Sequence, residues 1–102
     1  MSFRDRVIEG RRLFLLRRIV EMNGEANEGM LHIFAKDAGV GDPSRDDLRC
    51  DLDHLRQMGC VTERWDSDMR IAILTERGED VAHGRAAAEG VQRSRWDRRQ
   101  QS

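Results

Sequence analysis

The sequence predicts a mainly α-helical domain with a small β-hairpin, and three observations indicate it. Apolar residues recur at helical spacing over three segments that precede Gly59. Gly59 interrupts this pattern, and two runs of alternating residues follow at 60–65 and 69–74. A chain of 102 residues, of which 38% are hydrophobic, supports one small domain with a thin core. Such a core favours burial of further apolar surface in a homodimer.

Residues 3–22 are predicted to form the first helix, because apolar side chains recur there at helical spacing with pairs of arginines between them. The apolar run 13–16 covers more than one face of this helix. A small helical core buries one face, so we expect Phe14 or Leu15 to lie in a dimer interface. Asn23 and the glycine after it tolerate left-handed backbone and are expected to end the helix.

The next two helices carry recognisable start signals. Asn27 is a suitable N-cap for a second helix over residues 28–38. A turn rich in glycine, with one proline, follows it and prevents the second helix from continuing. Ser44 and Asp47 resemble a capping box for the third helix, with Asp in place of the usual Glu. Gly59 ends this third helix.

The two alternating runs are predicted to pair as a hairpin whose turn, residues 66–68, is acidic. Thr75 is expected to cap a fourth helix that continues to about Arg85. The domain is expected to span residues 1–90. Residues 91–102 have no periodicity and are predicted to form a basic, flexible C-terminal tail.

Charge is distributed unevenly, although the formal net charge is only −1. Residues 1–18 hold six arginines against two carboxylates, whereas residues 42–53 hold five aspartates against two arginines. The chain therefore has basic ends and an acidic middle. Lys36 is the one lysine among 18 basic residues. Arginine suits bidentate contact with phosphate or carboxylate, but a high-GC genome gives the same bias.

Several classes of protein are not expected from this sequence. No apolar run approaches the length of a membrane span and the N-terminus lacks the core of a signal peptide, so we expect no membrane partner and a cytoplasmic location. Cys50 and His54 form an i, i+4 pair that can chelate zinc, but such a pair arises more often by chance, and we expect no metal and no cofactor. Without a Gly-rich phosphate loop, a nucleophile elbow or a metalloprotease helix, we expect no enzymatic activity.

Two motifs carry a resemblance to known proteins. Residues 52–61 match the Leu-x-x-Leu-x-x-x-Gly-hydrophobic-Val pattern that ends the third helix of ArsR/MarR-type winged-helix regulators. Residues 74–78 resemble the Leu-Thr-Glu-x-Gly segment that follows the wing in many of them. More closely, residues 1–86 resemble small proteins of Mu-like phages and prophages that are labelled ArsR-type. The resemblance implies a winged helix-turn-helix fold, and it implies function by analogy.

A helix-turn-helix protein places its third helix in the major groove of DNA. Five arginines are the candidate DNA contacts: Arg45, Arg49, Arg56, Arg64 and Arg70. The first three form a stripe on the third helix and could bridge phosphates or contact guanine. The other two lie on the hairpin behind its acidic turn. Together with the resemblance, which implies a phage origin and a regulatory role, these arginines predict a DNA-binding transcriptional regulator whose partner is double-stranded DNA.

Acidic residues on the same helix favour a different partner. Four residues are expected to face outward: Asp46, Cys50, Asp53 and Gln57. The aspartates would repel phosphate, although Asp53 could pair with Arg49 or Gln57. The alternative prediction is a winged-helix adaptor that binds a phage or host protein through its acidic third helix and wing, in phage assembly or host takeover. Trp96, among the arginines of the tail, could stack on a base or dock on a partner subunit.

Overall fold

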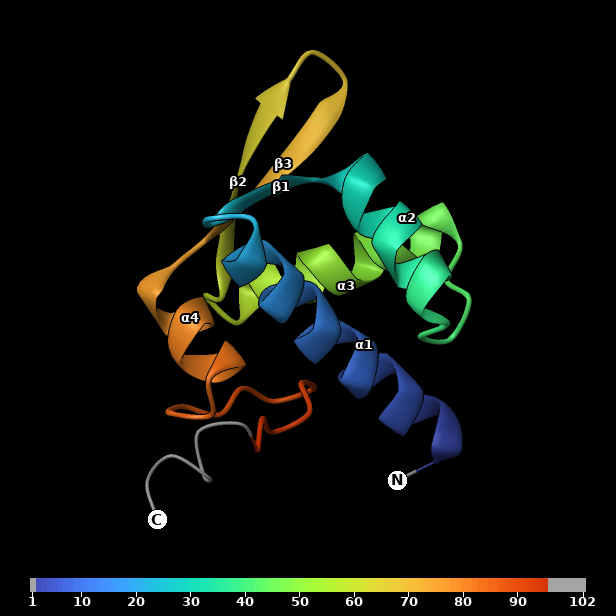
Figure 1. The fold of residues 1–102 in the computed structure, drawn as a ribbon, viewed down its shortest axis with the longest axis vertical. Coiled ribbons are helices and arrows are strands. Elements are labelled where there is room, and N and C mark those ends of the chain that lie inside the picture. Colours follow the sequence, from blue (N-terminus) through green and yellow to red (C-terminus); the bar gives the residue numbers. More distant parts are fainter. Residues whose placement is uncertain (1, 96–102) are drawn as a thin grey trace.

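Four helices and a three-stranded antiparallel sheet make up residues 2–95, the part of the chain that this computed structural model describes (Figure 1). In chain order they are α1 (Phe3–Glu21), β1 (Glu25–Asn27), α2 (Glu28–Ala38), α3 (Arg45–Gln57), β2 (Val61–Asp66), β3 (Met69–Leu74) and α4 (Glu76–Ala82). The hairpin of β2 and β3 extends away from the helices (Figure 1). The prediction of a mainly α-helical domain with a small β-hairpin is therefore confirmed.

Side-chain oxygens begin the helices as the sequence predicted. At α2, Asn27 Oδ1 accepts a hydrogen bond from the backbone N–H of Met30 over 2.7 Å. At α3, the side chains of Ser44 and Asp47 each accept a hydrogen bond from the other's backbone N–H, both over 3.0 Å. Each N-cap of this kind contributes about 1 kcal/mol. The start of α3 is therefore fixed by residues within its own first turn.

Left-handed backbone ends α1 and α3 at the predicted positions. Asn23 has a φ of 64° directly after α1, and Gly59 has a φ of 76° between α3 and β2. Glycine and asparagine tolerate this conformation better than other residues. The chain can therefore reverse between α3 and the hairpin within a few residues.

A third strand, β1, was not predicted. It contains three residues, Glu25–Asn27, and pairs with β3 so that Ala26 lies opposite Ala72. The sheet order is β1-β3-β2, which makes β3 the central strand. Three residues show too little alternation to indicate a strand, and β1 forms because the chain passes beside β3 on its way from α1 to α2 (Figure 1). Because β1 lies between α1 and α2 in the chain, its pairing with β3 connects the hairpin to these two helices.

Residues 91–95 pack on the domain, beyond the boundary that the sequence predicted at residue 90. Val91 and Ser94 are buried, and Gln92 donates a backbone hydrogen bond to Glu9 O over 3.1 Å. The helix α4 ends at Ala82, before the predicted Arg85, and an irregular segment then runs beside α1. Residues 96–102, including Trp96 and the rest of the predicted tail, lie outside the described part.

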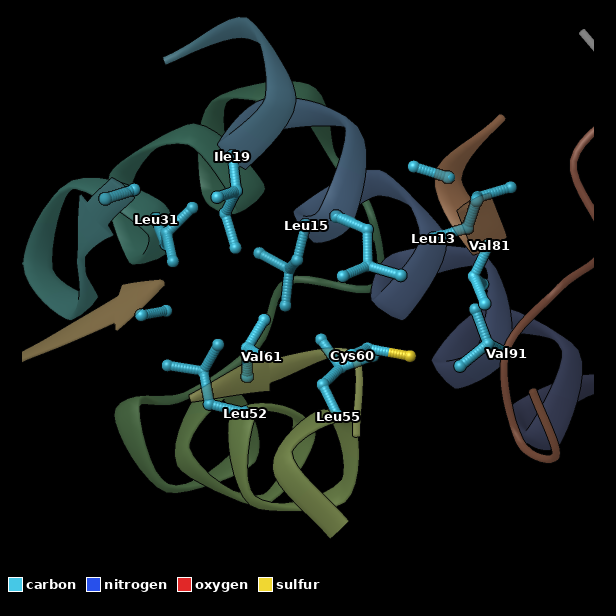
Figure 2. Packing of buried hydrophobic residues seen from close by; sticks show 14 of the residues in the cluster. Leu13, Leu15, Ile19, Leu31, Leu52, Leu55, Cys60, Val61, Val81 and Val91 are labelled. Carbon is cyan, nitrogen blue, oxygen red and sulfur yellow. The ribbon is translucent and has the colours of Figure 1, made fainter. Parts of the chain in front are cut away.

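The core lies between α1, α3 and the sheet, as Figure 2 shows. Its fully buried leucines come from three helices: Leu15 and Leu16 of α1, Leu31 of α2, and Leu48, Leu52 and Leu55 of α3. Burial of each such side chain contributes about 1.5–3 kcal/mol. Leu15 has 0% of its surface exposed, so it is a core residue of the single chain and cannot contact a second chain. Of the two predicted dimer residues, only Phe14 retains some exposed surface.

A buried ion pair fixes α3 against α1. Asp51 of α3 is 1% exposed and accepts hydrogen bonds from Arg11 Nε over 2.5 Å and from Arg12 Nε over 3.0 Å. Arg12 also donates to the carbonyl of Gly90 over 3.1 Å, which links the C-terminal segment to the same site. These two arginines therefore serve the interior of the fold and are not part of a basic surface.

Candidate functional site

The structure brings together three of the five arginines predicted to contact DNA. Arg45 and Arg49 of α3 and Arg70 of β3 surround Glu28, which lies in the first turn of α2. We call these four residues the Glu28 cluster. The remaining two arginines of the prediction lie outside it.

Glu28 is the centre of the cluster and is almost fully buried, with 4% of its side chain exposed. Its Oε2 atom accepts hydrogen bonds from Arg45 Nη2 over 2.8 Å and from Arg49 Nε over 3.1 Å. Its Oε1 atom lies 3.6 Å from Arg70 Nε. Arg45 and Arg49 are one helical turn apart on α3, and both side chains stay partly exposed. One carboxylate therefore holds two neighbouring guanidinium groups at the start of α3.

Arg70 connects the cluster to the hairpin and has little accessible surface, because 12% of its side chain is exposed. Its Nη1 donates to Asp53 Oδ1 over 2.8 Å, and its Nε lies 3.6 Å from Glu63 Oε2. The guanidinium carbon also lies 5.4 Å from the centre of the Trp65 ring, within cation–π range. Arg70 therefore bridges α2, α3 and β2, which leaves it little surface for phosphate.

The outward aspartates of α3 take part in two different pairs. Asp46, 91% exposed, lies 3.6 Å from Arg49 Nη1, an i, i+3 pair along the helix. The sequence suggested Arg49 or Gln57 as the partner of Asp53. In the structure Asp53 pairs instead with Arg70 of the hairpin. The difference arises because the long side chain of Arg70, at the start of β3, reaches a carboxylate in the middle of α3.

The two other predicted contacts are more accessible. Arg64 of β2 is half exposed and donates to Glu25 Oε1 over 3.1 Å, across the sheet. Arg56 is exposed in the last turn of α3. The hairpin turn between β2 and β3 exposes Asp66 and Asp68, as the sequence predicted. The face of α3 and the hairpin therefore carries both charges, closely interleaved.

The arginines keep Glu28 ionised. Burial raises the pKa of its carboxyl group, but the hydrogen bonds and charges of Arg45 and Arg49 lower it by more, so the pKa lies below its ordinary value. A buried carboxylate that stays charged at neutral pH requires partners of this kind. The cluster is therefore an ion-pair network at all physiological pH values.

Cys50 and His54, the possible metal ligands, do not converge with further ligands. Cys50 is exposed, and His54 Nε2 is hydrogen-bonded to the carbonyl of Glu89 over 2.7 Å. Within residues 2–95, no three His, Cys, Asp or Glu side chains lie close enough together to hold a metal ion. His54 contributes instead to the packing of the C-terminal segment on α3.

Sequence reasoning missed Glu28, which by itself resembles an ordinary acidic residue in the first turn of a helix. Its partners Arg45 and Arg49 are 17 and 21 residues further along the chain. One signal was present, because these arginines border the apolar face of α3 and do not oppose it. Guanidinium groups at the edge of a helix interface need a nearby carboxylate, and Glu28 supplies it.

The fold and the site define a class: a small, mainly helical protein that presents an arginine–carboxylate network on its third helix beside a β-hairpin. No protein-family model matches the chain, and no solved structure matches it. Among residues 2–95, no helix combines the length and apolar composition needed to cross a bilayer.

One similar protein comes from a bacteriophage. The "Uncharacterized protein gp26" of Escherichia phage Mu is 41% identical to this chain over 91 residues, which cover 89% of the chain and 94% of the phage protein. The chain therefore belongs to the same family of phage proteins as Mu gp26. This confirms the predicted resemblance to proteins of Mu-like phages.

Proposed function

We propose that this protein is a winged helix-turn-helix, ArsR/MarR-like protein that binds duplex DNA and acts as a transcriptional regulator of a phage or prophage. It would act in the cytoplasm of the host cell and would catalyse no reaction. One observation carries the proposal: α3 follows α2 after a short turn, has one exposed face, and is followed directly by a projecting hairpin. This is the order in which a recognition helix and a wing occur.

The partly exposed arginines support a specific mode of contact. In this mode α3 enters the major groove, with Arg45 and Arg49 in its first two turns close to the bases and phosphates. Arg56, in the last turn, would reach a phosphate further along the groove. Arg64 would contact the backbone from the hairpin, whereas Arg70 would act mainly by holding the hairpin against α3.

A homodimer would place two copies of α3 on one face of the DNA, about 34 Å apart for half-sites one helical turn apart. Phe14 on α1 is the remaining candidate for its interface, because it is only half-buried in the single chain. A dimer also doubles the number of arginines available to the DNA, which matters because each chain offers few.

A second candidate function is favoured by the carboxylates on the same face. Asp46, Asp66 and Asp68 are exposed, and most of the arginines near them already pair with carboxylates. Such a surface suits a basic protein partner better than a phosphate backbone. In this case the protein would be a winged-helix adaptor that binds a phage or host protein in phage assembly or host takeover.

Titration of labelled duplex DNA separates the two functions. The duplexes are a random sequence and the DNA that flanks the protein's own gene, at about 50 mM salt, where phosphate contacts are strong. A regulator should bind the flanking DNA at or below micromolar concentration and lose affinity steeply as salt rises. If neither duplex binds at tens of micromolar protein, the regulator is excluded and the adaptor becomes the better account.

A further inference from the structure

Glu28 pairs with the two arginines that the proposed function places nearest the DNA, Arg45 and Arg49. A single buried oxygen, Oε2, accepts hydrogen bonds from both Arg45 and Arg49. Because the two arginine side chains stay partly exposed, both remain accessible to a partner while paired. Glu28 therefore changes what these arginines offer to DNA without covering them.

The ion-pair network around Glu28 contains one more carboxylate than it contains arginines. Arg45, Arg49 and Arg70 are the cations of the network, and its anions are Glu28, Asp46, Asp53 and Glu63. Non-specific attraction to DNA depends on how many phosphates are neutralised by otherwise uncompensated positive charge. A network of this composition gives little attraction of that kind, although it contains three arginines.

The contact of Glu28 with Arg70 is longer than its contacts with Arg45 and Arg49. Three buried polar atoms in the Glu28 cluster have no hydrogen-bond partner among the described residues: Glu28 Oε1, Arg45 Nε and Arg70 Nε. Buried polar atoms are nearly always satisfied in folded proteins, and each exception costs stability. Glu28 Oε1 and Arg70 Nε face each other over 3.6 Å, so they attract each other as an ion pair without a close hydrogen bond.

We propose that Glu28 is a specificity-determining residue that masks Arg45 and Arg49 and so limits sequence-independent binding to phosphate. The inference rests on the proposed DNA-binding function and assigns a role to a residue outside α3. Base contacts by these arginines use two parallel hydrogen bonds and can offset the loss of a pair with Glu28. A contact with phosphate alone, which every DNA sequence offers, contributes less binding free energy and offsets that loss less well. Specificity is a difference between these two affinities, and Glu28 would increase it.

Glu28→Gln is the decisive variant, because it keeps the shape and one acceptor oxygen but removes the charge. We expect this variant to bind random duplex about tenfold more tightly at low salt, and its plot of log affinity against log salt to be steeper by about one, as for one more phosphate contact. The affinity for the flanking DNA should increase less, so the ratio between the affinities for flanking and for random duplex should fall. Glu21→Gln makes the same charge change on α1, where Glu21 pairs with Arg18, and should change neither affinity by as much as twofold.

A chemical measurement tests the masking without DNA and without any variant. Phenylglyoxal modifies accessible, unpaired guanidinium groups, and mass spectrometry locates the modified residues. In the wild-type protein, Arg45 and Arg49 should react several-fold more slowly than Arg56, which is exposed in the same helix. Equal rates would overturn the inference even if Glu28→Gln failed to fold.

The outcomes separate this inference from the proposed function. If the wild-type protein binds the flanking DNA while folded Glu28→Gln binds random duplex no more tightly, Glu28 is a structural residue and the regulator stands. If no duplex binds to either protein, the regulator itself fails and the role of Glu28 in DNA specificity fails with it.

Discussion

Arg11 Nε of α1 donates a hydrogen bond to Asp51 Oδ2 of α3 over 2.5 Å, and both side chains are buried. The pair sets the position of α3, because α1 is the helix on which the other elements pack (Figure 1). It also explains why part of the basic charge near the N-terminus is not available to a partner. The strength of this link can be measured directly.

Asp51→Ala should destabilise the protein by about 3–5 kcal/mol, because it leaves Arg11 buried without its carboxylate. Urea unfolding followed by circular dichroism gives the free energy of unfolding. The matched control is Asp42→Asn, which removes an exposed pair with Lys36 and should cost less than about 1 kcal/mol. Similar losses in the two variants would mean that the buried pair does not hold α3 in place.

The pKa of Glu28 predicts how stability depends on pH. The folded-state pKa lies below the unfolded value, so the stabilisation from its ionised form is present above about pH 4.3 and is lost as pH falls through the lower folded-state pKa. The free energy of unfolding of the wild-type protein should therefore decrease more between neutral and acid pH than that of Glu28→Gln. Urea unfolding at a series of pH values measures this, and parallel profiles would show that Glu28 is not stabilised by its arginines.

The packing of residues 91–95 predicts that Val91→Ala lowers the free energy of unfolding by about 1–2 kcal/mol, because two buried methyl groups are lost. Gln92→Ala, in the same segment but with an exposed side chain, should have less than half this effect. If neither change alters the free energy of unfolding, residues 91–95 do not contribute to the domain and it ends near residue 90, as the sequence predicted.

Features set by neighbouring residues could be predicted from the sequence, and features set by distant ones could not. The caps at Asn27 and Ser44 depend on residues within one turn, and both were predicted correctly. The run 13–16 covers more than one helical face, which predicts Phe14 or Leu15 in a dimer interface, but Leu15 is buried within the single chain. That reasoning failed because α1 packs against helices, the sheet and the C-terminal segment, so the chain itself covers several of its faces. The role of Glu28 could not be predicted either, because its partners Arg45 and Arg49 are distant in the sequence and only the fold brings them together.

Oligomeric state remains a prediction. We expect a homodimer through α1, and Phe14→Asp should shift it toward a monomer, because a charge in an apolar interface is costly. Light scattering at high micromolar protein reports the mass. The mass of a single chain for the wild-type protein would contradict the dimer.

Opposite changes of charge on α3 test the central claim, which is that this helix contacts duplex DNA through its arginines. Arg49→Ala removes a cation and Asp46→Asn removes the exposed anion that lies beside it, so the two variants alter one ion pair from its two sides. Neither side chain is in the buried core, and both variants are expected to fold.

The direct measurement is the affinity of these two variants and of the wild-type protein for labelled duplex, over a range of salt concentrations beginning at about 50 mM. The account predicts that Arg49→Ala binds more weakly with a shallower salt dependence, while Asp46→Asn binds random duplex more tightly. The opposite order, or equal affinity of all three proteins, would show that α3 does not contact DNA.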